Sequence, residues 1–123
     1  MTIRELYHGA NGDKILHILR FRNMQPDAQG KIYFSERRYD SVFMHGGDLK
    51  RKLTLAVKVR VLIPEDVVLE RTSTQGVADT LVVATKTPIV ADVLELYVRR
   101  PNAANVEVIR GFADIQKLLT AAA

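Results

Sequence analysis

The chain has 123 residues, of which 47% are hydrophobic and 26% are charged. This length suits one domain, residues 1–123, and the composition is that of a folded globular protein. No apolar run approaches the roughly 20 residues that cross a bilayer, and the N-terminal residues lack the apolar stretch of a secretory signal. The chain has no cysteine, which excludes disulfides, a thiolate nucleophile and cysteine-ligated zinc. We therefore expect a cytoplasmic protein with no membrane partner.

Charge is spread unevenly along the chain. Residues 1–60 hold 12 Lys/Arg and 6 Asp/Glu, a net charge of +6, whereas residues 61–123 have a net charge of −2. A basic half suits a polyanionic partner or a phosphate-bearing ligand, and a solvated basic surface explains it equally well. The three histidines are not at metal-ligand spacing, so we expect no metal site.

The first third of the chain predicts alternating strands and helices. We expect a strand over residues 3–8, a helix over 11–22, a strand over 31–35 and a short helix over 36–43. Asn11 or Asp13 can cap the first helix, because their short side chains accept hydrogen bonds from its free amides. Pro26 and Gly30 mark the loop that follows this helix.

Apolar residues at every second position from Leu53 to Ile63 form the clearest pattern in the sequence. This period predicts a long strand with one face toward water. Further strands are expected over residues 67–69, 78–84 (a central strand), 93–98 and 105–109, with a turn over 88–92. A helix over 112–119 should bury Phe112, Ile115 and Leu119. Six or seven strands with two or three short helices predict an α+β domain with a mostly antiparallel sheet.

Two short motifs stand on the first two expected strands. Leu6-Tyr7-His8-Gly9 precedes the Ile-Leu-rich helix, and Gly30-Lys31-Ile32-Tyr33-Phe34-Ser35 follows the loop. Their order resembles the His-Tyr-acid branch of the ADP-ribosyltransferase superfamily. That branch includes poly(ADP-ribose) polymerases, diphtheria-type toxins and small rifamycin-modifying transferases. The resemblance is close over residues 6–35, although Ala10 stands where the family usually has Thr or Ser. It implies a small split antiparallel sheet of ADP-ribosyltransferase type, with NAD as the substrate.

The resemblance also implies roles for individual residues. His8 would bond the ribose next to nicotinamide, and the backbone of Gly9 would bond the nicotinamide amide. Tyr33 would stack on the nicotinamide ring, an arrangement that contributes about 0.5–1.5 kcal/mol beyond burial. Because side chains alternate along a strand, Ile32 points to the opposite face, and we assign it to the core.

Further ligand contacts would come from the segment after the Tyr33 strand. Tyr39 is the best match for a second aromatic that sandwiches the ring, and Phe43 is the alternative. Arg37 and Arg38 could reach the diphosphate, because the fork of a guanidinium matches two phosphate oxygens. Residues 50–52, Lys-Arg-Lys, allow the same role, with a solvated loop as the favoured interpretation.

The family places an acid on a later strand, where its charge stabilises the cation that develops on the ribose. Asp79 is the preferred candidate, since it begins an apolar strand and follows Gln75-Gly76. Glu95 and Glu107 are the alternatives. Each of the three is also compatible with a solvated carboxylate on a strand face.

The expected function is therefore NAD-dependent mono-ADP-ribosyl transfer to a nucleic acid, a protein or a small molecule, and a toxin domain is one setting for it. One alternative is a non-catalytic basic module that binds RNA or a protein partner. Another is an enzyme like the RNA 2′-phosphotransferases, which resemble this superfamily in fold and use NAD with a basic residue set in place of the acid.

Overall fold

The computed structural model describes residues 1–37, 39–72 and 80–121. It contains two α-helices, one 3-10 helix and nine strands in this part of the chain. In chain order the elements are β1 (Thr2–Gly9), α1 (Gly12–Phe21), β2 (Asn23–Met24), β3 (Lys31–Ser35), η1 (Asp40–His45), β4 (Gly47–Asp48), β5 (Leu53–Ile63), β6 (Leu69–Thr72), β7 (Thr80–Ala84), β8 (Ile89–Arg99), β9 (Glu107–Arg110) and α2 (Phe112–Ala121).

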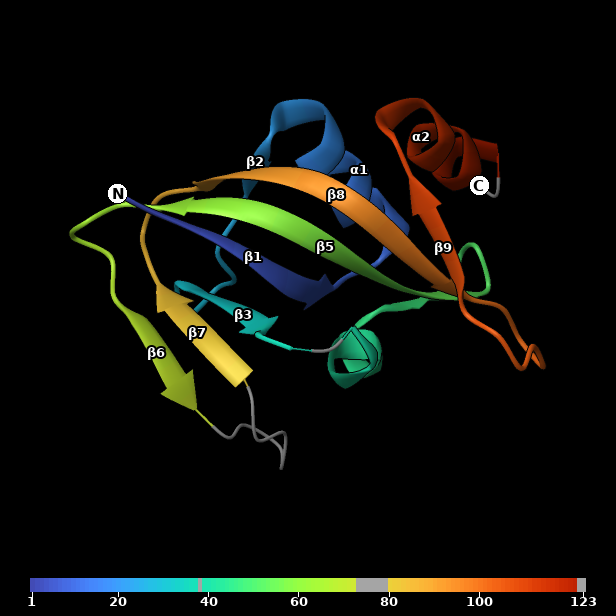
Figure 1. Ribbon diagram of the computed structural model, residues 1–123, viewed down its shortest axis with the longest axis horizontal. Helices are drawn as coiled ribbons and strands as arrows, with labels where there is room; N and C mark the ends of the chain where they lie inside the picture. The colour runs from blue at the N-terminus through green and yellow to red at the C-terminus, as the bar shows by residue number, and fades with distance from the viewer. Residues whose placement is uncertain (38, 73–79, 122–123) are drawn as a thin grey trace.

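The strands form one sheet in the order β2-β8-β5-β1-β3-β7-β6, with β4 beside β5 and β9 beside β8. Every pairing among the described strands is antiparallel. The predicted α+β class with a mostly antiparallel sheet is thus confirmed. The long strands β1, β5 and β8 run together through the middle, whereas β6 and β7 take a different direction (Figure 1).

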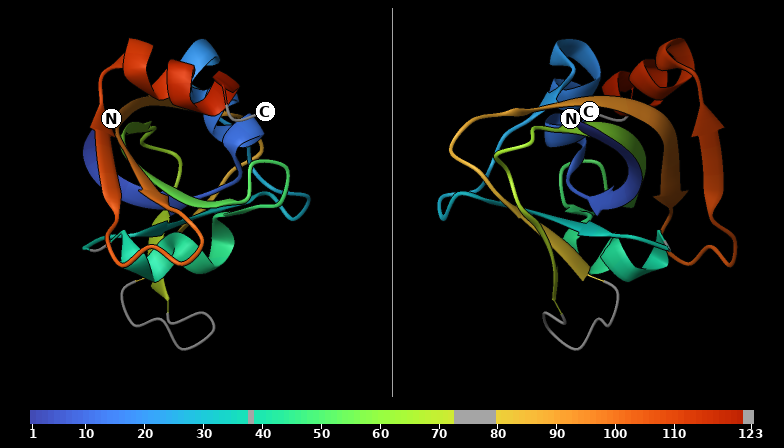
Figure 2. Two further views of the ribbon diagram at one scale, coloured as in Figure 1. Left: turned by 90° about the vertical axis from the view of Figure 1, so that its right-hand side faces the viewer. Right: turned by 60° about the vertical axis from the view of Figure 1, so that its left-hand side comes forward.

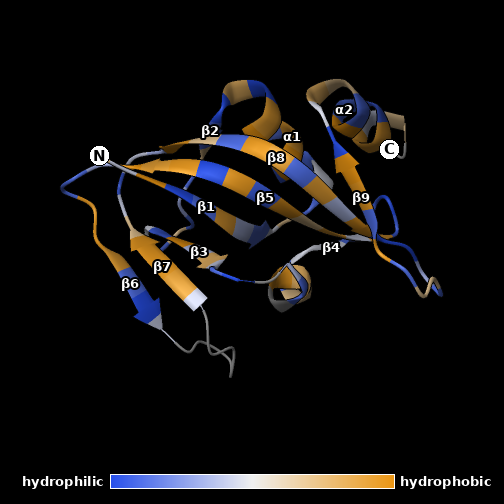
Figure 3. Ribbon diagram, viewed as in Figure 1, coloured by the Kyte–Doolittle hydropathy of each residue, from blue (hydrophilic) through white to orange (hydrophobic). Residues whose placement is uncertain are grey.

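The main core lies between the long strands and the two α-helices. Alternate residues of β5, from Leu53 to Ile63, are buried on this side, as their period predicts. Ile115 and Leu119 of α2 and Ile15 of α1 are fully buried against them. Figure 2 shows both helices over the same side of the sheet, and Figure 3 shows the banding of apolar and polar residues along β5 and β8. Burial of this apolar surface is the main stabilising contribution to the fold.

A smaller cluster covers part of the opposite face. Ala56 of β5 and Tyr97 of β8 lie beside each other in the sheet and pack with Val42 and Phe43 of η1. The ring of Tyr39 stacks on Tyr97 with a centroid distance of 4.4 Å. The face of β5 that the sequence assigns to water is therefore covered in its middle by η1.

Four sequence-based expectations are wrong. The segment expected as a helix over 36–43 forms instead the 3-10 helix η1, beginning at Asp40. The turn expected over 88–92 lies within β8, because Pro88 precedes a strand that starts at once with Ile89. Phe112, expected in the core, is 55% exposed at the start of α2. In addition, β7 lies between β3 and the last strand of the sheet rather than at its centre.

A buried ion pair joins three parts of the chain. Arg51 and Asp48 have side chains that are 2% and 3% exposed, and the guanidinium lies 3.0 Å from the carboxylate. Asp48 also accepts the amide of Gly12 at the start of α1, and Arg51 donates to the carbonyl of Leu119 in α2. Arg51 also pairs with Asp13. Burial opposes ionisation of Asp48, but the hydrogen bonds from the amides of Arg51 and Gly12 and from the guanidinium hold its pKa below the usual value.

We predict that Asp48→Ala lowers the free energy of unfolding by about 3–5 kcal/mol, because it leaves the Arg51 charge buried with only an exposed partner. Asp13→Ala is the matched control. The Asp13 side chain is 63% exposed, so its loss should cost less than about 1 kcal/mol. Urea unfolding of both variants measures the difference. An equal loss of unfolding free energy in the two variants would show that the contribution of the Arg51–Asp48 pair does not depend on its burial.

Candidate functional site

The sheet opens at the seam between β1 and β3. β1 pairs with β5 along its whole length, from Thr2 to Gly9, but with β3 only where Tyr7 faces Ser35. In a continued ladder Gly9 would face Tyr33, and no such pair forms. The end of β1 and the middle of β3 are therefore open to a ligand.

The His8 side chain occupies this opening. Its Nδ1 lies 2.8 Å from the carbonyl oxygen of Tyr33, and its ring packs beside Phe34. A carbonyl only accepts, so Nδ1 carries the proton and Nε2 is left as an acceptor in the neutral ring. Burial lowers the pKa of His8; the bond to Tyr33 opposes this, and the charges of Lys14 and His45 add to the lowering. The ring is therefore held neutral with Nε2 available.

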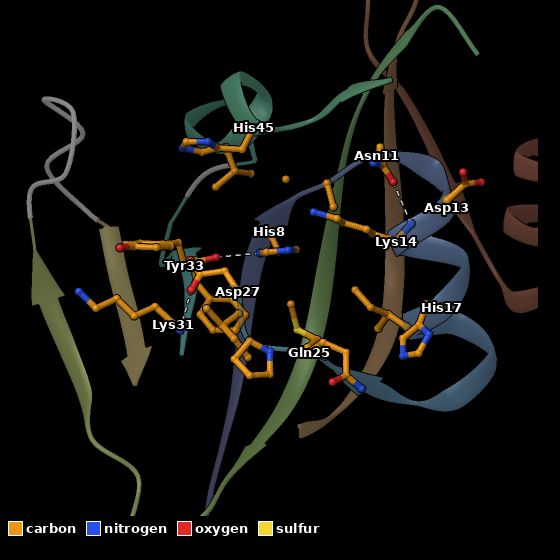
Figure 4. Close-up of a pocket in the computed structure, with 18 of the residues that line it drawn as sticks. His8, Asn11, Asp13, Lys14, His17, Gln25, Asp27, Lys31, Tyr33 and His45 are labelled. Carbon is orange, nitrogen blue, oxygen red and sulfur yellow. Dashed lines mark hydrogen bonds between the residues drawn. The ribbon is translucent and has the colours of Figure 1, made fainter. Parts of the chain in front are cut away.

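A cavity of about 940 Å³ lies against this seam. Its size is within the range of small-molecule and cofactor sites. The walls come from the end of β1, one side of α1, the loop after α1, β3 and η1 (Figure 4). His8, Gly9 and Tyr33, which the sequence predicts to share a site, all line it. Residues 25 positions apart in the chain are thus brought together.

Gly9 has a packing reason to be glycine. A side chain at this position would collide with the backbone carbonyl of Val42, because η1 lies directly against the end of β1. The same close approach places Val42 and His45 of η1 at the cavity. Its glycine identity is therefore required by the fold, and its backbone lies at the open seam.

Tyr33 lines the cavity from the middle of β3, together with the residues on either side of it. Its neighbours Ile32 and Phe34 are buried in the main core, as the predicted assignment of Ile32 requires. Tyr33 itself is half-buried, and its hydroxyl points away from His8 (Figure 4). One side of its ring is therefore a candidate platform for a planar group.

Three residues that the sequence predicts as ligand contacts, Tyr39, Phe43 and Arg37, do not line the cavity. Tyr39 stacks on Tyr97 and contacts Tyr7, in the cluster on the other face of the sheet, and Phe43 packs in the same cluster. The physical reason is the 3-10 geometry of η1, which turns Val42 rather than either aromatic ring toward the cavity. Arg37 is exposed and does not line the cavity. Arg38 lies outside the described residues.

The three candidate acids differ in whether the structure describes them and in where it places them. Asp79 lies outside the described residues; Thr80, which follows it, begins β7 and lines the cavity. Glu95 accepts the hydroxyl of Tyr97 and lies 2.7 Å from Arg110, away from the cavity. Glu107 pairs with Arg100 and does not line the cavity either. Neither Glu95 nor Glu107 lines the cavity in this structure.

Several lining residues have no counterpart in the sequence-based prediction. Lys14 and His17 reach the cavity from α1, and His45 reaches it from η1. The spacing of Lys14 and His17, three apart after the Asn11 cap, places both on one side of the helix and was the available signal. The position of His45 at the cavity depends on the path of η1, and no local sequence pattern indicates that path. The described residues contain no group of three or more His, Asp or Glu that could hold a metal.

No family model, curated protein or solved structure matches this chain. The helices in the described part of the chain are too short or too polar to cross a bilayer.

We predict that the His8 ring titrates below 6.5, the ordinary histidine pKa, with the pKa read from its NMR signals as pH changes. Between the folded pKa and 6.5 the unfolded chain binds a proton that the folded chain does not. The free energy of unfolding should therefore fall as pH is lowered through this window. A His8 pKa at or above 6.5 would contradict the partly buried, neutral ring described above.

Proposed function

We propose that this protein is an NAD-dependent mono-ADP-ribosyltransferase, with the split sheet of that superfamily. The observation that carries the proposal is that His8, Gly9 and Tyr33 line one cavity at the open seam between β1 and β3. The sequence resemblance assigns these three residues to one NAD site. Because His8 and Tyr33 are 25 positions apart in the chain, they can line one cavity only if the fold brings β1 and β3 together.

The chemistry of the cavity supports a dinucleotide that enters with its nicotinamide end first. The half-buried ring of Tyr33 offers a stacking surface for a planar base. The backbone of Gly9, which no β3 residue pairs with, offers hydrogen bonds to a carboxamide. Nε2 of His8 is available to accept a ribose hydroxyl. A ligand held at these points would place the nicotinamide–ribose bond inside the cavity.

In the proposed reaction the glycosidic bond from ribose C1′ to the nicotinamide nitrogen breaks. The electron pair leaves with the nicotinamide, which becomes neutral, and the acceptor forms the new bond to C1′ and gives up its proton. The ribose carries positive charge in the transition state, which a carboxylate stabilises in a dry site. By resemblance this carboxylate is Asp79, which lies outside the described residues.

A second candidate, transfer of the kind the RNA 2′-phosphotransferases perform, is favoured by one observation. The two carboxylates among the described lining residues are engaged elsewhere: Asp13 with Arg51 and Asp27 with the amides of Lys31 and Gln29. Lys14 and the imidazoles of His8, His17 and His45 line the same cavity. A 2′-phosphate acceptor would use such a basic set in place of an acid.

We predict that the wild-type protein releases nicotinamide from NAD and that Asp79→Asn lowers this rate about 100- to 1,000-fold with NAD affinity within a few-fold. Asn keeps the shape and hydrogen bonds of Asp but removes the charge. Glu95→Gln is the matched control and should leave the rate unchanged, because Glu95 lies away from the cavity. Nicotinamide release measures turnover and calorimetry measures affinity.

Three results would revise this account. Activity abolished by Glu95→Gln and spared by Asp79→Asn would contradict the choice of acid. Activity on a 2′-phosphorylated oligonucleotide that survives Asp79→Asn would favour the second candidate. A folded sample that binds no NAD at millimolar concentration would refute the proposal and leave a non-catalytic module.

A further inference from the structure

Lys14 is a positive charge directed into the cavity. It lies in the first turn of α1, and its side chain extends toward His8 (Figure 4). Neither an ion pair nor a side-chain hydrogen bond holds its ammonium within residues 1–37, 39–72 and 80–121. An exposed lysine of this kind is ordinarily a solvated surface charge. Lys14 differs from such a surface charge because its side chain lines a cavity.

The nearby carboxylates do not neutralise Lys14. Asp13, the adjacent residue, points the other way, where it pairs with Arg51 at 2.9 Å and Lys50 at 3.8 Å (Figure 4). Asp27 accepts the backbone amides of Gln29 and Lys31. The charge of Lys14 is therefore open to an anion that enters the cavity.

The N-terminus of α1 does not itself provide the anion site. The amide of Gly12 donates to Asp48 at 2.7 Å, and the amide of Lys14 donates to Asn11 at 2.9 Å. These caps occupy two of the first-turn amides that a phosphate would otherwise use. Side chains are therefore the main groups available to recognise an anion here.

His45 provides a second positive or hydrogen-bonding group. It lines the cavity from η1, on a different wall from Lys14, and both act electrostatically on His8 between them. Figure 4 shows the Lys14 side chain extending from α1 toward His8, with His45 on the η1 wall of the same cavity. An anion bound by both Lys14 and His45 would contact groups from two elements, α1 and η1, that are far apart in the chain.

We propose that Lys14, with His45 opposite, binds the diphosphate of a dinucleotide or nucleoside diphosphate ligand. Given the proposed function, this is the diphosphate of NAD. Lysine binds phosphate as a point charge and a donor of up to three hydrogen bonds. Lys14 thereby takes the place that the sequence assigns to Arg37, which does not line the cavity.

The test compares Lys14→Gln with Arg20→Gln. Both residues are exposed on α1, and each change removes one positive charge while keeping a residue with good helix propensity. The two differ in that Lys14 lines the cavity and Arg20 does not. Calorimetry with ADP-ribose, inorganic pyrophosphate and nicotinamide measures each affinity. Lys14→Gln should weaken ADP-ribose and pyrophosphate about 10- to 100-fold, and nicotinamide less than twofold. Arg20→Gln should change all three less than twofold.

The outcomes separate this proposal from the proposed function. ADP-ribose that binds Lys14→Gln as tightly as Arg20→Gln overturns the role of Lys14 and leaves the function standing. Pyrophosphate that binds through Lys14, with no binding of NAD or nicotinamide, supports the anion site and overturns the function. An equal loss of nicotinamide affinity in Lys14→Gln would show that Lys14 acts by shaping the cavity, and would also overturn the proposal.

Discussion

The buried pair of Arg51 and Asp48 fixes the place where α1 begins. Asp48 holds the first amide of the helix and Arg51 holds the end of α2, so one ion pair sets both helices against the sheet. Two charges buried together are not strongly stabilising in themselves, but either one left alone would be costly. The pair therefore acts as a constraint on geometry. In the helix that begins at this point, Lys14 and His17 line the cavity beside the seam between β1 and β3.

The seam is the second constraint, and it follows from the first strand. β1 is fully paired on its β5 side, so its end is held firmly while its other edge parts from β3 after one pairing. The His8 ring satisfies the Tyr33 carbonyl that a continued ladder would use. The fold thus meets its backbone hydrogen-bonding requirement there and keeps a cavity open. A ligand that binds beside His8 does not have to break a strand pairing.

Much of the framework could be predicted from local patterns. The alternation from Leu53 to Ile63 sets the central strand, and Asn11 marks the beginning of α1. The order of the two short motifs placed His8, Gly9 and Tyr33 together, and they do line one cavity.

The rest depends on contacts between distant segments. Arg51 stands in a basic Lys-Arg-Lys run that is typical of a solvated loop, and its burial depends on Leu119, far along the chain. The sequence does not indicate that Tyr39 stacks on Tyr97 of β8, because this contact depends on a distant strand and on a 3-10 rather than an α-helical turn. Lys14 carries no motif, and its role becomes visible only when the helix is placed against β1.

The central claim is that the open seam is a nicotinamide site, and a crystal structure of the protein with nicotinamide at saturating concentration tests it most directly. The account predicts the nicotinamide ring against Tyr33, its carboxamide on the backbone of Gly9 and the His8 ring still bonded to the Tyr33 carbonyl. Nicotinamide ordered only at another surface, or a cavity left empty of it at that concentration, would contradict the account.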